Sequence, residues 1–118
     1  DLDNFKIIND TYGHLFGDKV LQMFAALLRS NIRICDLACR FGGDEFVVLL
    51  RNANLEKLTT VKQQIQVAAR TWIARDKKLR GLDISIGTSM LQQSETSTID
   101  SLLKAADKSM YAIKQSKK

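Results

Sequence analysis

The sequence predicts an α/β (α+β) fold, in which a mixed, largely antiparallel sheet is flanked by helices. Stretches with apolar residues at helical spacing alternate with short apolar runs that are typical of strands. Two of these runs are separated only by a glycine pair and an acidic pair, which indicates a β-hairpin. Strands that alternate with amphipathic helices imply one sheet with helices packed against it, and a hairpin makes that sheet at least partly antiparallel.

Two helices are predicted in the first quarter of the chain. Residues 4–11 carry apolar side chains at helical spacing, and Asn4 or the residue before it can cap this helix. A longer apolar stripe predicts a second helix over residues 18–30, with Gly17 and Asp18 marking its start.

A hairpin and three further elements follow. The hairpin strands are expected at about residues 35–41 and 46–51, on either side of the glycine and acidic pairs. Apolar residues on one face then predict two more helices, and alternation of apolar and polar residues predicts a half-buried strand between them. The helix, the strand, a polar loop and the last helix are expected over residues 55–74, 82–87, 94–98 and 99–116.

Composition narrows the class of protein. The chain has 118 residues, of which 45% are hydrophobic, so we expect one globular domain with one core. The net charge is +5, but aromatic residues are not interleaved with the basic ones, so we expect no nucleic-acid partner. No apolar run is long enough to span a membrane. We expect a cytoplasmic domain that is truncated at both ends, and leave open a membrane anchor elsewhere in the parent protein.

Acidic residues at two places indicate a metal site. Asp44 and Glu45 are adjacent like charges beside the turn of the hairpin, and such charges repel unless a cation or a cluster of donors lies between them. Asp1 and Asp3 open the chain, and they would face the hairpin tip if they lay at the end of a neighbouring strand. Carboxylates that converge from two loops can hold Mg²⁺. An ordinary polar turn is the alternative interpretation.

Four motifs resemble those of the diguanylate cyclases. Gly42-Gly43-Asp44-Glu45-Phe46 spells the GGDEF signature of that family, and residues 1–18 resemble its D-x-D-x-F-K-x-I-N-D-x-x-G-H-x-x-G-D stretch. Residues 85–87 and 106–114 resemble its S-I-G strand and its A-D-x-x-[LM]-Y-x-x-K helix. The motifs occur in family order and cover almost the whole chain. Residues 1–118 are therefore identified as a GGDEF domain that lacks its N-terminal helix and the start of its first strand.

The resemblance implies a fold and an activity. The fold would be like that of nucleotidyl cyclases and polymerase palm domains. The domain would condense two GTP molecules into cyclic di-GMP and pyrophosphate by Mg²⁺-dependent attack of a 3′-hydroxyl on an α-phosphate. Each domain of the family binds one GTP, so a homodimer is implied. An N-terminal sensor or regulatory domain is expected in the parent chain.

The resemblance also assigns the catalytic residues. Asp1 and Asp44 would bind Mg²⁺, or Mn²⁺ in its place, with help from the Leu2 carbonyl. Asp44 would also accept the proton of the 3′-hydroxyl, and Lys6 would steady charge on the phosphates. Glu45, which follows Asp44 in the signature, is placed in the same catalytic set.

Substrate-binding residues follow from the same motifs. Asn9 and Asp18 match the guanine readers, because an amide can pair with the guanine edge and a carboxylate can accept from N1–H and N2–H₂. Both residue types also cap helices, which is the alternative role. His14 stands where the family has a histidine on the substrate side. Gly42 and Gly43 would let the nucleotide approach the backbone closely.

Two lysines near the C-terminus match phosphate contacts. Lys114 corresponds to the lysine that reaches the β- and γ-phosphates, and Lys118 stands where the family often has an arginine. The glycine that usually precedes this arginine is Lys117 here. Lysine keeps the charge but loses the bidentate fork of arginine, which weakens the expected grip on the triphosphate.

A separate pair matches the inhibitory site of the family. Arg33 and Asp36 form an R-x-x-D motif at the family's distance before the hairpin, where product cyclic di-GMP binds and holds two domains apart. Arginine suits both a phosphodiester and the Hoogsteen edge of guanine. The alternative is a surface Arg–Asp ion pair that contributes less than about 1 kcal/mol.

Two other functions compete with the cyclase. A catalytically inactive module could bind GTP or cyclic di-GMP as a sensor, but the intact set of Asp1, Lys6 and Asp44 favours an enzyme. The palm domain of another nucleotide polymerase would not need the guanine readers or the inhibitory motif.

Overall fold

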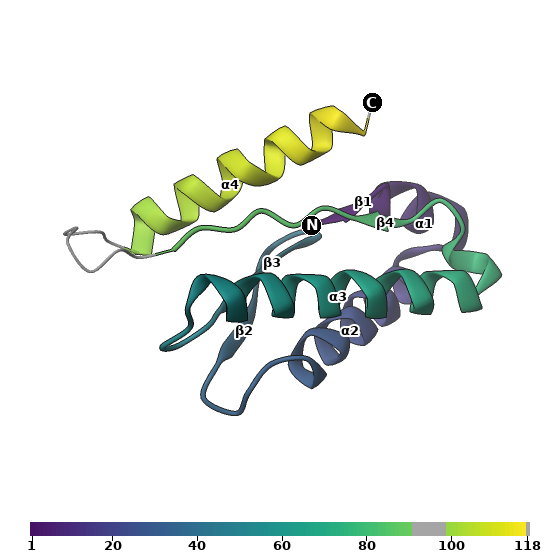
Figure 1. Cartoon of the computed structure of the whole chain (residues 1–118). Coiled ribbons are helices and arrows are strands. Elements are labelled where there is room, and N and C mark those ends of the chain that lie inside the picture. The colour runs from purple at the N-terminus through teal and green to yellow at the C-terminus, as the bar shows by residue number, and fades with distance from the viewer. Residues whose placement is uncertain (91–98, 118) are drawn as a thin grey trace. The chain divides into compact units, whose positions relative to one another are not determined.

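The computed structural model describes residues 1–90 and 99–117, which divide into two compact units, Asp1–Ile84 and Ser85–Lys118 (Figure 1). The predicted loop at 94–98 and Lys118 lie outside the described residues. The elements are β1 (Leu2–Asp3), α1 (Phe5–Tyr12), α2 (His14–Ser30), β2 (Leu37–Gly42), β3 (Glu45–Leu49), α3 (Leu55–Arg75), the 3₁₀ turn η1 (Lys77–Leu79), β4 (Asp83–Ile84) and α4 (Ile99–Ser116). This confirms the predicted mixed α/β class.

The described strands form two antiparallel pairs. β2 pairs with β3 as the predicted hairpin, and β1 pairs with β4 so that Leu2 lies opposite Ile84. The two pairs meet through a backbone hydrogen bond, which Leu2 N–H donates to Asp44 O at 3.2 Å. β4 is shorter than the predicted strand over residues 82–87, because β1 offers it only two residues to pair with.

The second helix begins earlier than the sequence predicted. α2 starts at His14, after Gly13, whose φ of 88° separates α1 from α2. Gly17, expected to mark the helix start, lies inside α2. Asn4 occupies the N-cap position of α1, but its side chain makes no cap and instead donates to Gly81 O at 3.0 Å.

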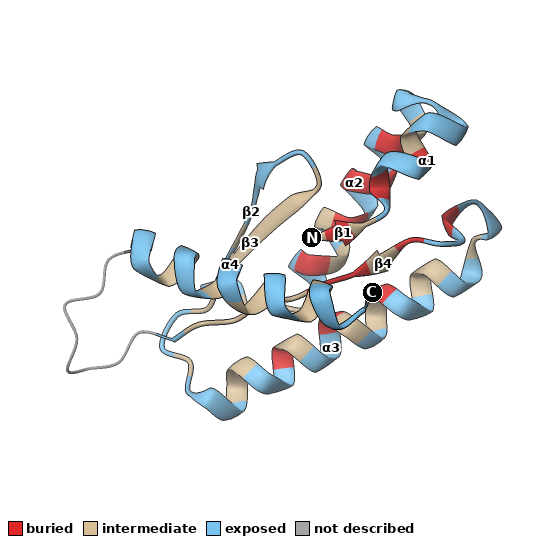
Figure 2. Ribbon diagram, turned by 90° about the horizontal axis from the view of Figure 1, so that it is seen from above, coloured by how far each residue is buried: buried red, intermediate tan, exposed pale blue. Residues whose placement is uncertain are grey.

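The core of the first unit is built around Phe24. This side chain of α2 is 1% exposed and contacts the rings of Phe46 in β3 and Trp72 in α3, at centroid distances of 5.0 and 6.3 Å. Buried residues gather on β1, β4 and single faces of α2 and α3 (Figure 2). Through Phe24, α2 therefore packs against both the hairpin and α3.

In the second unit, residues 85–90 lie along α4. Ser89 Oγ donates to Leu102 O at 2.6 Å, and Lys117 Nζ donates to Ser85 Oγ at 3.0 Å. Between these contacts, Gly87 lies so close to α4 that a Cβ atom there would be 2.7 Å from Cβ of Met110. Among the helices of the described residues, none has the length and apolar character needed to cross a membrane.

Candidate functional site

The signature residues form a two-residue turn at the hairpin tip. β2 ends at Gly42 and β3 begins at Glu45, so Gly43 and Asp44 make the turn. Gly43 has a φ of 41°, in the left-handed region that glycine adopts easily. Asp44 and Glu45 are both half-buried, whereas Gly42 and Gly43 are exposed. The turn therefore presents two carboxylates beside accessible backbone.

The start of the chain lies against this turn. The hydrogen bond from Leu2 N–H to Asp44 O places Asp1 one residue from the turn. Leu2 is fully buried, and Oδ1 of Asp1 is a buried atom. The structure thus brings together Asp1, Leu2 and Asp44, the three residues that the sequence predicted as metal ligands.

This donor set fits Mg²⁺. Two carboxylates and a backbone carbonyl are hard oxygen ligands, and Mg²⁺ commonly takes one or two carboxylates and completes its shell with water and substrate phosphates. Within residues 1–90 and 99–117, no group of three or more His, Cys, Asp or Glu side chains could hold a metal ion. An ion at the turn would therefore depend on phosphate and water for its remaining ligands.

The predicted nucleotide-binding residues lie on α1 and at the start of α2. Lys6 and His14 are exposed, in the first turns of α1 and α2 respectively. Asn9 is half-buried and packs against Gly17, the residue before Asp18 in α2. The two predicted guanine readers therefore belong to neighbouring positions of two packed helices.

Asp18 also lines a pocket between α2 and the hairpin. The pocket has a volume of about 400 Å³, and its lining includes Arg40 and Phe46. Arg40 Nε donates to Gly43 O at 2.7 Å, so Arg40 links the pocket to the turn. The α2 wall thus carries the Asp18 carboxylate and the Arg29 guanidinium, and the hairpin wall carries Arg40, a combination suited to a base with donors and a phosphate.

Arg33 and Asp36 form a closed cluster away from the turn. Oδ2 of Asp36 accepts from Arg33 N and Nε at 2.9 and 3.0 Å, and Oδ1 accepts from Arg33 Nη2 at 2.9 Å and Arg51 N at 3.0 Å. Arg33 Nη2 also donates to Arg51 O. The Asp36 side chain is 0% exposed and that of Arg33 is 38% exposed. The Arg33 hydrogen bonds, aided by the Arg51 N–H, hold the pKa of Asp36 well below its usual range, although burial acts in the opposite direction.

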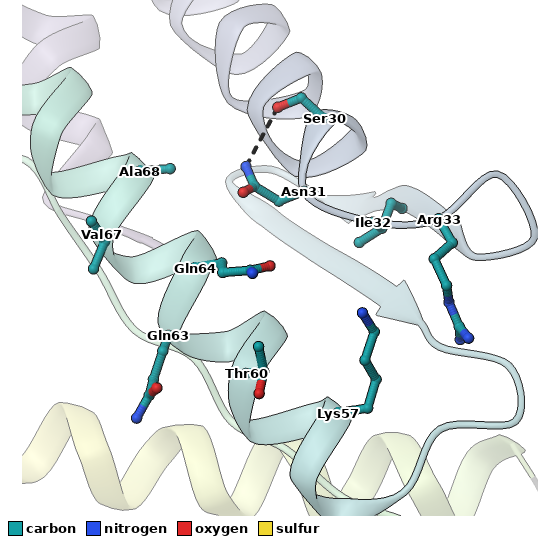
Figure 3. Close-up of a pocket in the computed structure, with 10 residues that line it drawn as sticks. All are labelled: Ser30, Asn31, Ile32, Arg33, Lys57, Thr60, Gln63, Gln64, Val67 and Ala68. Carbon is teal, nitrogen blue, oxygen red and sulfur yellow. Dashed lines mark hydrogen bonds between the residues drawn. The ribbon is translucent and has the colours of Figure 1, made fainter.

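A wide groove of about 740 Å³ lies beside this cluster, between α3 and the segment that follows α2. Figure 3 shows Lys57 and Gln64 pointing from α3 toward the segment that carries Ile32 and Arg33. The lining of the groove therefore combines two cationic side chains, Arg33 and Lys57, with the amides of Asn31, Gln63 and Gln64. Such a lining suits an anionic ligand that also presents hydrogen-bonding edges.

Lys114 belongs to the second unit. It lies near the end of α4 and is half-buried. Lys118 is outside the described residues, so the pair predicted to grip the triphosphate is described only in part.

Comparison with known proteins decides the family. The sequence profile of the family described as "Diguanylate cyclase, GGDEF domain" matches residues 1–118. The chain belongs to the GGDEF family. Among its relatives, the response regulator PleD of Caulobacter vibrioides is 40% identical, over 98% of this chain and 26% of that protein. Diguanylate cyclase A of Treponema denticola is 39% identical, over 98% of this chain and 31% of that protein.

Solved structures agree with this assignment. The coiled coil and GGDEF domain of DgcB from Caulobacter crescentus, in complex with cyclic di-GMP, matches with a TM-score of 0.86 and 26% identity. The match covers 98% of this chain and 62% of that one. The GGDEF domain described here therefore spans about a quarter to a third of the two curated relatives.

Sequence reasoning missed Arg40 in this GGDEF domain. The register of the hairpin shifts between Arg40 and Gly42, so the alternation of a regular strand does not run from Arg40 to the turn and gives no signal for this contact. Arg51 was missed because its backbone reaches Asp36 across 15 residues of sequence, and no local pattern signals that contact.

Proposed function

We propose that this GGDEF domain condenses two GTP molecules into cyclic di-GMP. The observation that carries the proposal is the hydrogen bond from Leu2 N–H to Asp44 O, which joins the residue after Asp1 to the hairpin turn. Carboxylates from two separate segments gathered at exposed glycine backbone suit a triphosphate held with Mg²⁺. The family relationship favours GTP as that triphosphate.

The acidic residues at the turn, together with Leu2 and Lys6, have separate roles in this proposal. Asp44 accepts the proton of the attacking 3′-hydroxyl as that oxygen bonds to the α-phosphorus of the second GTP and pyrophosphate leaves. Asp1, Asp44 and the Leu2 carbonyl would hold Mg²⁺, which when bound supplies positive charge to the attacking and leaving oxygens. Lys6 is exposed in the first turn of α1 and would add positive charge at the phosphates. Glu45, the first residue of β3, would be the second carboxylate beside Asp44.

The remaining residues bind and orient the substrate. Asn9, which packs against Gly17, and Asp18, the next residue of α2, would read the guanine edge. His14 would contact the substrate side of α2, and Lys114 with Lys118 would contact the β- and γ-phosphates. One domain carries one such set whereas the product holds two GMP units, so two copies must meet as a homodimer. A sensor or regulatory domain in the parent would control that meeting.

We also propose that cyclic di-GMP inhibits the domain at Arg33 and Asp36. The supporting observation is the groove of about 740 Å³ that Arg33 and Lys57 line, away from the hairpin turn. A related GGDEF domain is described in complex with cyclic di-GMP. A ligand at this groove would bind without occupying the GTP pocket, and could hold two domains apart.

The test is product formation by the full-length protein with Mg²⁺ and GTP. Asp44→Asn should lower cyclic di-GMP formation far more than tenfold without unfolding the protein, because the proton acceptor and a metal ligand are lost. Asp100→Asn is the matched control, since Asp100 is an exposed acid in the first turn of α4 and belongs to none of the family motifs. Turnover by Asp44→Asn within tenfold of the parent would contradict the proposal. Binding of GTP without any product from the parent would favour a sensor instead.

A further inference from the structure

Gly17 is a buried glycine inside α2 that needs an explanation. Glycine is less favourable than alanine in a helix interior, and the backbone of Gly17 is helical, so its conformation does not require glycine. The explanation is space. A Cβ atom on Gly17 would collide with Oδ1 of Asn9, and would lie 2.9 Å from Cγ of Asn9 and 3.3 Å from Cζ of Phe5. The missing side chain is what lets the Asn9 carboxamide lie against α2.

Backbone hydrogen bonds hold the two helices in this register. Gly13 N–H donates to Asn9 O at 2.8 Å, and Gly17 N–H donates to Gly13 O at 3.1 Å. Phe5, which is 7% exposed, closes the other side of the space that a Gly17 side chain would enter. Asn9 is therefore confined between its own helix and Gly17, the residue that precedes Asp18 in α2.

We propose that Gly17 is a positioning residue that sets the preference of the domain for guanine over adenine. This inference rests on the proposed GTP-binding function and deepens it. Guanine offers N1–H and N2–H₂ donors with an O6 acceptor, whereas adenine offers an N1 acceptor with an N6–H₂ donor. An amide and a carboxylate separate the two bases only if both are held in fixed positions, and Gly17 fixes the amide beside the carboxylate of Asp18.

The first experiment measures base preference in the full-length protein. The probes are 3′-deoxy-GTP and 3′-deoxy-ATP with Mg²⁺, because they lack the attacking hydroxyl and bind without turnover. Gly17→Ala should lower the ratio of the two affinities by tenfold or more, to the level of Asn9→Ala, because the new methyl group displaces the carboxamide. Lys19→Ala, an exposed position of the same helix, should keep the parental ratio.

The second experiment separates positioning from packing by a double-mutant cycle on thermal unfolding. Gly17→Ala should lower the melting temperature in the parent. In an Asn9→Ala background the colliding atoms are absent, so the same substitution should leave the melting temperature unchanged or raise it. The double variant should show the affinity ratio of Asn9→Ala alone.

Each contrary result has one meaning. If Gly17→Ala keeps the parental ratio while Asn9→Ala loses it, Gly17 does not position Asn9. If Gly17→Ala destabilises both backgrounds equally, the glycine serves the packing of Phe5 and the inference is overturned. If the parent itself does not distinguish the two nucleotides although it folds, the guanine assignment fails and the inference fails with it.

Discussion

Asp36→Asn is expected to loosen the segment that presents Arg33. The carboxylate accepts four hydrogen bonds from N–H groups of Arg33 and Arg51, two on each oxygen, and a weak one on Oδ1 from Cys35 Sγ at 3.8 Å. Asparagine keeps only one of the two oxygens. In either orientation of the amide, its NH₂ group therefore faces two N–H donors. Two bonds are lost, each with a net contribution of about 0.5–1.5 kcal/mol. The Arg33 side chain is 38% exposed, so water can partly replace the hydrogen bonds that Arg33 loses. We expect a loss of about 1–2 kcal/mol in the free energy of unfolding.

The assay is unfolding of the full-length protein as a function of pH, with Asp100→Asn as the control for loss of an exposed acid. The pKa of Asp36 is lowered in the folded state, so the unfolded chain binds the proton more readily and stability falls as the pH falls. The stabilising effect should be fully present above the ordinary carboxyl pKa of about 4 and fade as the pH drops below it. The parent and Asp36→Asn should therefore differ most from pH 5 to 8 and converge in acid. A difference that is absent at pH 7, or unchanged at pH 2, would refute the reasoning.

Three further substitutions test other parts of the domain. Arg33→Ala should leave the initial rate near that of the parent and raise the cyclic di-GMP concentration for half-inhibition more than tenfold, since charge-assisted contacts contribute about 1.5–3 kcal/mol. Half-inhibition at the parental concentration would show that Arg33 belongs to an ordinary surface ion pair. Arg40→Ala should raise the Mg²⁺ concentration for half-maximal rate severalfold, because Arg40 Nε braces Gly43 O at 2.7 Å; superimposable Mg²⁺ curves would argue against that brace. Gly87→Ala should lower the free energy of unfolding by about 1–3 kcal/mol in chemical denaturation, because the new methyl group would press on α4 beside Met110. An unchanged denaturation midpoint would contradict the close approach of Gly87 to α4.

The sequence predicted what depends on local periodicity. The hairpin over Gly42 to Glu45 and the helix faces follow from spacing that neighbouring residues impose on one another, and the structure has them. The placement of Asp1 near Asp44 was also predicted, because acidic residues at two separate points of the chain imply convergence on a cation.

Contacts across long sequence separations escaped prediction. The sequence predicts a helix start at Gly17 because glycine is unfavourable inside helices, whereas Gly17 lies within α2 and its missing side chain leaves room for Asn9. The sequence also predicts Asn4 or Asp3 as the cap of the first helix, whereas the Asn4 side chain donates to Gly81 O. In both cases a tertiary neighbour outweighs the local preference of the residue, and no pattern within a helical turn reveals that neighbour.

The central claim is that the turn carrying Asp44 supports condensation of two GTP molecules. The most direct measurement follows GTP, pyrophosphate and cyclic di-GMP together by mass spectrometry, in the full-length protein with Mg²⁺. Each cyclic di-GMP contains two phosphodiester bonds formed by loss of pyrophosphate, so two GTP should disappear and two pyrophosphate appear for every product molecule. The same signals should vanish in Asp44→Asn and persist in Asp100→Asn. Consumption of GTP without cyclic di-GMP, or equal product from Asp44→Asn, would contradict the account.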